Sequence, residues 1–289
     1  MTKPIKNVAA SIRQRLQNKA RQNQQRFDDL LQYYAIERFL YRLAQSPHRD
    51  TFVLKGALIF LTWGTPFARS TRDVDLLAYM DNSIAHVVKV MREICQQPVI
   101  EDGMRFEASS VKGETIREQA EYQGVRVKFL GWLENARVNM QIDLGFADVV
   151  TPKPKLVTYP VLLELPQPKL RGYPPETVIA EKLQAMIFLG MSNSRMKDFY
   201  DLWILAQTQA GYKTTLAEAI RKTFARRGTE LPLELPIVFT EEFANTKQKM
   251  WLAFRDKANL LESPADINEI VTRLREWLMP MIRIARKKK

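Results

Sequence analysis

The sequence has few of the residues that build disulfide frameworks and zinc centres. Among 289 residues there is one cysteine, Cys95, and there are two histidines, His48 and His86. A single cysteine excludes an internal disulfide, and these counts argue against a zinc site made of cysteine and histidine. Any bound metal would therefore be held by carboxylates, and the lack of disulfides favours a reducing, cytoplasmic compartment.

Long apolar runs are also missing. The longest runs, such as 57–61, contain five apolar residues, whereas a helix that spans a bilayer needs about 20. No apolar core follows the basic N-terminal residues, so we expect neither a membrane segment nor a secretory signal. Apolar residues make up 46% of the chain and charged residues 26%, which is typical of a globular protein and excludes a wholly disordered one.

Acidic residues are absent from both ends of the chain, and the net charge is +12. Residues 1–26 contain seven basic side chains and residues 280–289 contain five, so these two segments account for the whole excess. Basic segments attract polyanions by neutralising phosphates and releasing counterions, which makes RNA or DNA a candidate partner. Solvated tails that aid solubility are the alternative.

Alternation of apolar and polar residues predicts strands in the first half of the chain. The clearest run covers 136–144, where the alternation is uninterrupted. Further strands are expected at 51–54, 72–79 and 124–130, and helices at 8–24, 27–45, 57–63 and 84–96. This mixture predicts an α/β (α+β) fold for the first half.

Prolines are concentrated in the middle of the chain, where residues 152–175 hold seven of the fifteen. Proline fixes φ and lacks a backbone N–H, so this segment is predicted to be extended with little regular structure. Helical periodicity then predicts helices at 176–189, 196–208, 215–226, 241–258 and 264–279, the last with Ser263 as its N-cap. We therefore expect an N-terminal part at 1–150, an extended linker at 151–175 and a helical domain at 176–289.

Three carboxylates are candidates for a metal site. Asp73 and Asp75 are two residues apart on an expected strand, so their side chains point to the same face, and Asp143 lies on the polar face of another strand. Converging carboxylates repel one another unless a cation lies between them, and Mg²⁺ or Mn²⁺ prefers such oxygen ligands. Metal ions held in this way would suit an in-line nucleotidyl transfer. A surface aspartate pair without a metal is the alternative.

The turn Lys55-Gly56-Ala57, between an expected strand and an expected helix, is a candidate phosphate site. Gly56 allows close approach of the backbone, and N–H groups at the start of the helix would face the phosphate. Arg69 and Arg72 flank the aspartate pair, and a phosphate contact for at least one of them is weighed against a structural ion pair.

Five short segments carry these candidates in a fixed order: FVLKGAL at 52–58, RSTRDVDLL at 69–77, QIDLGFAD at 141–148, VIAEK at 178–182 and NSRMKDFYDL at 193–202. Together they resemble the AbiEii/AbiGii family of nucleotidyltransferase toxins. The resemblance implies a polymerase-β-like nucleotidyltransferase core with a mixed sheet, followed by a helical C-terminal half. It also implies a toxin of an abortive-infection or toxin–antitoxin system that acts in phage defence.

The resemblance assigns roles to the matching positions. It implies that Asp73 and Asp75 bind the metal, with Asp143 as a third metal carboxylate and Asp148 as a weaker candidate for that place. Lys182 matches a lysine that contacts the triphosphate, and Asp198 matches an essential aspartate, which we expect to orient Lys182. The predicted catalytic set is thus Asp73, Asp75, Lys182 and Asp198, and the predicted nucleotide-binding set is Lys55, Gly56, Ala57, Arg69, Arg72 and Lys182.

We therefore expect a metal-dependent enzyme that transfers a nucleoside monophosphate from an NTP to an RNA acceptor. Because some members of the family that the chain resembles modify the 3′ end of tRNA, tRNA is the expected acceptor and a block of translation the expected effect. A cognate antitoxin protein is implied as a partner. Two alternatives remain open, namely a nucleotidyltransferase that modifies a protein hydroxyl and a catalytically inactive relative that binds nucleic acid.

Overall fold

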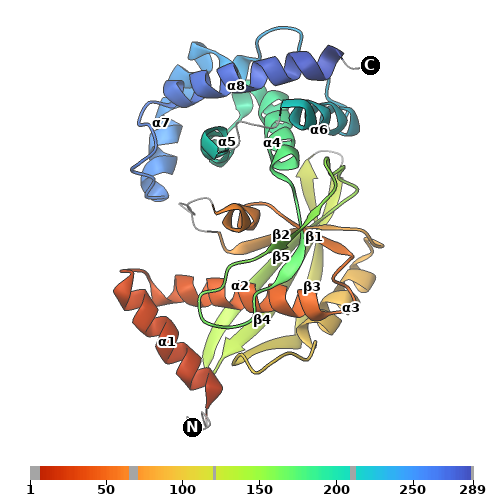
Figure 1. Cartoon of the computed structure of the whole chain (residues 1–289), viewed down its shortest axis with the longest axis vertical. Coiled ribbons are helices and arrows are strands. Elements are labelled where there is room, and N and C mark those ends of the chain that lie inside the picture. The colour runs from red at the N-terminus through yellow and green to blue at the C-terminus, as the bar shows by residue number, and fades with distance from the viewer. Residues whose placement is uncertain (1–6, 65–70, 120–121, 209–212, 288–289) are drawn as a thin grey trace. The chain divides into compact units, whose positions relative to one another are not determined.

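The computed structural model describes residues 7–64, 71–119, 122–208 and 213–287 (Figure 1). The chain forms two compact units. Unit 1 contains the helices and strands that precede residue 147 together with the segment 156–172, and unit 2 contains the segment 148–155 and the chain from Tyr173 onward. The proline-rich segment is therefore divided between the two units.

Unit 1 is built on a seven-stranded mixed sheet with the strand order β3-β4-β5-β2-β1-β7-β6. β2 runs parallel to β5 and β1 parallel to β7, while β1–β2, β3–β4 and β4–β5 are antiparallel. The predicted α/β class with a mixed sheet is thus confirmed. The strands are β1 (Phe52–Lys55), β2 (Asp73–Ala78), β3 (Met104–Gln119), β4 (Tyr122–Leu133), β5 (Ala136–Phe146), β6 (Lys155–Thr158) and β7 (Lys169–Gly172).

Helices cover the apolar face of this sheet. Figure 1 shows α2 lying across the strands, and the ring of Phe39 on α2 packs against Phe106 and Phe129 with centroids 5.9 and 5.3 Å away. On α3, Ile84 lies close to Gly113 of β3. The helical elements of unit 1 are α1 (Val8–Gln22), α2 (Phe27–Gln45), the 3₁₀ helix η1 (Leu58–Trp63) and α3 (Ile84–Cys95).

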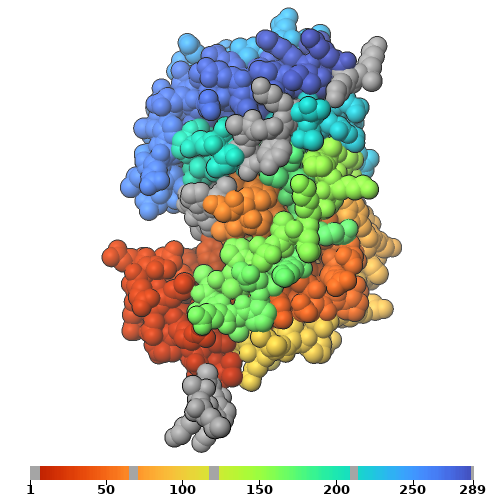
Figure 2. Space-filling model, in the orientation of Figure 1, coloured from red at the N-terminus to blue at the C-terminus, as the bar shows by residue number. Residues whose placement is uncertain are grey.

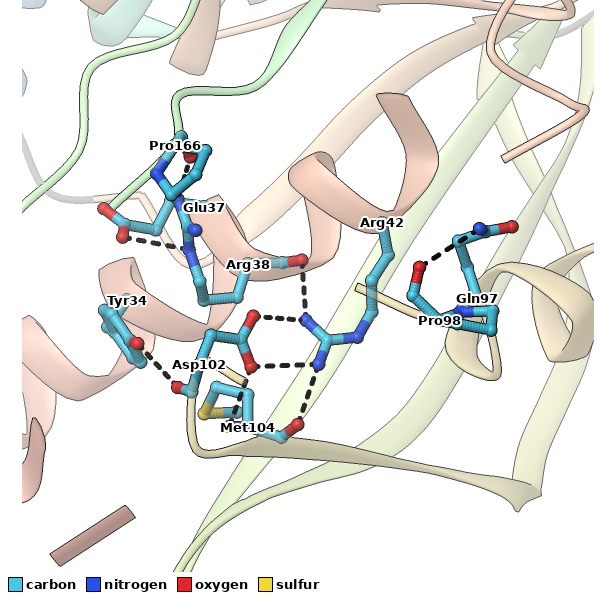
Figure 3. A network of polar contacts seen from close by, with 9 residues as sticks. All are labelled: Tyr34, Glu37, Arg38, Arg42, Gln97, Pro98, Asp102, Met104 and Pro166. Atoms are coloured by element: carbon cyan, nitrogen blue, oxygen red, sulfur yellow. Dashed lines mark hydrogen bonds and ion pairs between the residues drawn. The ribbon is translucent and has the colours of Figure 1, made fainter. Parts of the chain in front are cut away.

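A buried ion pair attaches α2 to the start of β3 (Figure 3). Arg42 donates two hydrogen bonds to the carboxylate of Asp102, at 2.7 and 3.0 Å, and a third to the carbonyl oxygen of Met104 at 2.8 Å. One turn earlier, the Arg38 guanidinium donates to the carbonyl oxygen of Pro166. Both arginines are buried, so each side-chain charge is held inside the unit by a specific set of acceptors.

The segment between β6 and β7 lies over α2. The backbone N–H of Leu162 donates to the Glu37 carboxylate at 2.7 Å, and Pro166 accepts the bond from Arg38. Figure 2 shows this segment, in light green, at the surface beside the orange and red of the first helices. This segment therefore shields the buried polar groups of α2 from solvent.

Unit 2 is helical, as predicted for the second half of the chain. Trp251 is fully buried and the stacked rings of Phe199 and Phe243 lie 5.3 Å apart in its core. The helices are α4 (Pro175–Leu189), α5 (Met196–Thr208), α6 (Lys213–Arg226), α7 (Glu241–Lys257) and α8 (Ile267–Lys287). Within the described part of the chain, no helix combines the length and the apolar character needed to cross a membrane.

Several sequence-based boundaries were wrong. The long strand β3 was not predicted, because a register shift between Glu107 and Lys112 interrupts its alternation. Two short strands, β6 and β7, lie in the proline-rich region, where only an extended chain was expected. The helix expected at 57–63 is present as a 3₁₀ helix that begins at Leu58.

The last helix also differs from its prediction. It begins at Ile267 rather than at residue 264, and the Asp266 carboxylate accepts the N–H of Asn268 near its start. Ser263 instead donates its hydroxyl to the carbonyl oxygen of Leu260. The helix continues past Pro280, which is exposed, so the missing N–H leaves a carbonyl that water can reach.

Candidate active site

The aspartate pair lies on β2 at the centre of the sheet. Asp73 and Asp75 are half-buried, whereas Val74 between them is fully buried, so both carboxylates point to the polar face. Directly opposite Asp75 lie Lys55 on β1 and Asp143 on β5, and residues in register point to the same face. The structure therefore brings together four residues that the sequence placed in the site.

Gly56 follows β1 and adopts φ +69°, a conformation that favours glycine. A Cβ atom at this position would lie 2.6 Å from Cγ of Asp75. Only a residue without a side chain can therefore pass this close to the carboxylate. The next residue, Ala57, is buried.

Asp143 is held by a residue that was not predicted for the site. Arg126 on β4 lies opposite Asp143, and its Nε and Nη2 atoms donate to Oδ1 and Oδ2 at 2.8 and 2.7 Å. These hydrogen bonds raise the pKa of Arg126 above its usual value. The alternation at 124–130 puts Arg126 on the polar face, but the pairing across β4 and β5 could not be read from it.

Of the two arginines that flank the aspartate pair in the sequence, the structure describes only Arg72. Arg72 is exposed, and its Nη2 lies 3.1 Å from Oδ1 of Asp29 on α2. This contact is the structural ion pair that was weighed against a phosphate contact. Arg69 lies outside the described residues.

A second charged centre occupies unit 2. Lys182 on α4 lies 2.7 Å from Oδ1 of Asp198 and 2.8 Å from Oδ2 of Asp201, both on α5. The Nε atom of Arg195 lies 2.6 Å from the other oxygen of Asp198. Asp198 is thus in contact with Lys182, the residue that it is predicted to orient.

Asp198 has no exposed surface, and this burial by itself raises the pKa of its carboxyl. Lys182 and Arg195 lower it by more, so the pKa lies below its ordinary value and the group stays ionised. The carboxylates of Asp198 and Asp201 thus hold the Lys182 ammonium in place.

Asp148 also belongs to unit 2 in the structure. Its Oδ1 lies 3.4 Å from Nη2 of Arg227, and the same nitrogen lies 3.6 Å from Glu181. Burial lowers the pKa of Arg227, but the two acidic neighbours raise it overall. Asp148 therefore takes part in an ion-pair cluster of its own unit.

Carboxylate pairs of this kind are suited to a hard divalent cation. Within the described ranges, no three histidine, cysteine, aspartate or glutamate side chains form a cluster that could hold a metal. The donors that fit one are the carboxylates of Asp73 and Asp75, which share a face of β2, while Asp143 opposite Asp75 is also bound by Arg126.

Comparison with known proteins identifies the family. A family model described as the nucleotidyl transferase AbiEii toxin of type IV toxin–antitoxin systems matches residues 38–273. The chain belongs to the AbiEii family. It is therefore a nucleotidyltransferase toxin of a type IV toxin–antitoxin system, and the family implies an antitoxin partner.

The comparison with solved structures found two proteins of Helicobacter pylori. One is JHP933, with 14% identity, a TM-score of 0.47, and coverage of 87% of this chain and 90% of that one. The other is described as a "putative nucleotidyltransferase", with 14% identity, a TM-score of 0.47, and coverage of 87% and 94%. A comparison with curated proteins found no match.

Proposed function

We propose that this AbiEii toxin transfers a nucleoside monophosphate from an NTP to an RNA acceptor, with the tRNA 3′ end as the acceptor and a block of translation as the result. The observation that carries the proposal is the shared face of Asp73 and Asp75, with Lys55 opposite Asp75 and Gly56 against its carboxylate. Carboxylates beside a close-approaching backbone suit a metal-bound triphosphate.

The metal proposed here is Mg²⁺ or Mn²⁺, held by Asp73 and Asp75. When bound, it would neutralise charge on the α-phosphate and on the leaving pyrophosphate. Asp143 could join as a third ligand through the lone pairs that remain on its oxygens, and the two hydrogen bonds from Arg126 compete with the cation for its charge. With Arg126 in place, Asp143 is part of an ion pair beside the two ligands.

The remaining assigned residues would position the triphosphate. Lys55 pairs with Asp75 across β1 and β2 and Gly56 lies against its carboxylate, so Lys55 and the backbone at Gly56 and Ala57 are proposed to contact phosphate oxygens. Lys182 is proposed to bind the triphosphate, with Asp198 and Asp201 holding its ammonium in place. Arg69 and Arg72 are further candidates for phosphate contacts, and Arg72 would have to leave Asp29 to make one.

The acceptor hydroxyl oxygen would form a bond to the α-phosphorus while the bond to the bridging oxygen breaks. Pyrophosphate leaves, and the hydroxyl proton passes to solvent. In this step the chain contributes alignment and charge stabilisation rather than a covalent intermediate.

Incubation of the purified protein with each labelled NTP, Mg²⁺ and either total tRNA or total cellular protein tests the proposal. We expect label on tRNA, and Asp73→Asn with Asp75→Asn should lower the rate by about a thousandfold, or roughly 4 kcal/mol of transition-state stabilisation. Asp50→Asn, a change at an exposed aspartate of unit 1, is the matched control and should leave the rate unchanged.

The other outcomes reject the proposal. Label on protein would show a protein-modifying transferase, and label on neither would show a binding relative without catalysis. A double variant that transfers nucleotide as fast as the wild type would remove the carboxylate pair from the mechanism.

A further inference from the structure

A groove opens in unit 1 where two strands of the sheet differ in length. β5 pairs with β2 only from Gln141 onward, so residues 136–140 extend past the start of β2. Gln32 of α2 crosses this step and donates weakly to the carbonyl oxygens of Arg72 and Asn139, at 3.4 Å each. The step therefore leaves a space bordered by α2, β2 and β5.

The groove has a volume of about 820 Å³. Its lining comes from α2, β2, β5, β4 and β3 and includes apolar residues such as Phe129 and Met140. On the polar face of the sheet, Asp73, Gln141, Lys128 and Lys112 of this lining lie in one row of paired positions. A space of this size accepts a single strand rather than a duplex.

Among the charged residues of the lining, basic side chains outnumber acidic ones. Five of the charged residues that line the groove are cations and two are acids: Arg26, Arg72, Lys112, Lys128 and Arg137, against Asp28 and Asp73. Lys128 contacts Glu114 at 2.6 Å. Lys112 and Arg137 are exposed, and the described part of the chain provides no acidic partner for either. These two charges are therefore available to an anion.

Uncharged polar groups lie between the cations. Gln141 and Asn139 on β5 and Ser110 on β3 line the same groove. Amides and hydroxyls can form hydrogen bonds with base edges and ribose hydroxyls, while cations neutralise the phosphates. The lining thus combines both kinds of group that a nucleic-acid strand requires.

The position of the groove relative to the aspartate pair gives it a role. Lys55 and Gly56, which are proposed to contact the triphosphate, lie on the β1 side of β2. The groove lies on the β5 side and ends at Asp73. A nucleotide donor and an acceptor strand would therefore meet at the carboxylates from opposite sides.

We propose that this groove binds the single-stranded 3′ end of the RNA acceptor, with Lys112, Lys128 and Arg137 contacting its phosphates. The inference rests on the proposed function, because it names where the RNA of that reaction lies. It assigns to the chain an acceptor site that adjoins the proposed nucleotide site and shares Asp73 and Arg72 with it.

A charge-reversed variant, Lys112→Glu with Arg137→Glu, tests the groove. The matched control is Lys89→Glu with Arg92→Glu, which makes the same charge change at exposed positions of α3, on the opposite side of the sheet. Binding of a short fluorescein-labelled single-stranded RNA is measured by anisotropy over a range of salt concentrations. The KM values for tRNA and for NTP are measured in the labelling assay.

The groove variant should bind the RNA at least about tenfold more weakly, and its log K against log salt should have a slope smaller by about 1–2. Its KM for tRNA should rise while its KM for NTP stays the same, and the control should match the wild type. The milder change Lys112→Gln with Arg137→Gln should give a smaller effect in the same direction, which separates local charge from a folding defect.

Equal losses in the groove variant and the control would overturn the inference, as would unchanged RNA binding in the groove variant. If tRNA is still labelled at the wild-type KM, the acceptor site is elsewhere but the proposed function stands. If the wild-type protein labels no RNA while the groove variant alone loses RNA binding, the reaction is wrong and the binding site stands.

Discussion

Unit 1 contains two bidentate arginine–aspartate pairs whose surroundings differ. The side chains of Arg42 and Asp102 are 7% and 1% exposed, and backbone groups of Arg38 and Met104 complete their hydrogen bonds. Those of Arg126 and Asp143 are 32% and 11% exposed and lie on the polar face opposite Asp75. One arginine–aspartate pair therefore lies inside the packed core, and the other lies beside the candidate active site.

The difference shows how burial decides what an ion pair does. A buried charge that loses its partner cannot be hydrated, so the pair is fixed to the fold. A pair with one third of the arginine exposed can open, because water replaces the partner at small cost. The Arg126–Asp143 pair is thus expected to be held less firmly than the Arg42–Asp102 pair.

Removal of each aspartate tests this comparison most directly. Asp102→Ala leaves Arg42 buried without its carboxylate and should lower the free energy of unfolding by about 3–5 kcal/mol. Asp143→Ala leaves a partly hydrated Arg126 and should cost about 1 kcal/mol or less. Urea unfolding of both variants measures the two losses, and losses of equal size would contradict the comparison.

Glu37 on α2, which is also buried, makes the stability of unit 1 depend on pH. Burial raises the pKa of Glu37 to about 7, against an ordinary value of about 4.3. The folded state therefore holds a proton that the unfolded state has lost, and stability should fall as the pH rises through this window.

We expect a loss on the order of 3 kcal/mol between pH 4.5 and pH 7 for the wild type. Glu37→Gln, which cannot ionise, should flatten that slope. Urea unfolding at several pH values measures it. Wild type and variant with the same slope would show that Glu37 does not titrate in this range.

Asp198 tests in unit 2 whether removal of a buried charged partner lowers stability. Asp198→Asn removes a buried charge shared by Lys182 and Arg195 and should lower stability by about 2 kcal/mol, since Lys182 retains Asp201. The pKa of Asp198 lies below its ordinary value. Its contribution should therefore be present above the ordinary pKa and be lost as the pH falls through the lowered one.

Thermal unfolding of wild type and Asp198→Asn between neutral and acid pH measures this contribution. The two melting curves should differ at neutral pH and converge in acid. A fall in nucleotide transfer by the folded variant would support a role in positioning Lys182, whereas a lower melting temperature with normal turnover would show a purely structural role.

The smallest effect is expected for metal binding when the partly exposed Arg126–Asp143 pair is removed. Arg126→Ala frees both oxygens of Asp143 beside Asp75, so Mn²⁺ should bind a few-fold more tightly. Isothermal titration with Mn²⁺ measures this, and Arg92→Ala on α3 is the control. An unchanged or weaker affinity would show that Asp143 does not reach the cation even when Arg126 is absent.

Much of the fold could be predicted from short-range pattern. The strand at 136–144 and the helix at 27–45 follow from periodicity, because side chains that face one core repeat at the period of their element. β3 could not be predicted in this way, since its register shift breaks the alternation and only pairing with β4 holds it together. The start of α8 was misplaced because Ser263 hydrogen-bonds within the preceding turn.

The sequence by itself determined the chemistry that is available: a carboxylate pair on one strand face, a glycine turn before it, a lysine and aspartate in the helical half, and cations at both ends. The carboxylate pair, the glycine turn and the terminal cations follow from residue types and spacing, whereas the lysine and aspartate were singled out by the resemblance to the family. The tertiary structure decided which charges meet. Arg126 reaches Asp143, and Lys112 and Arg137 line one groove with Asp73, only because strands distant in the chain pair in a particular register, and no local pattern encodes that register.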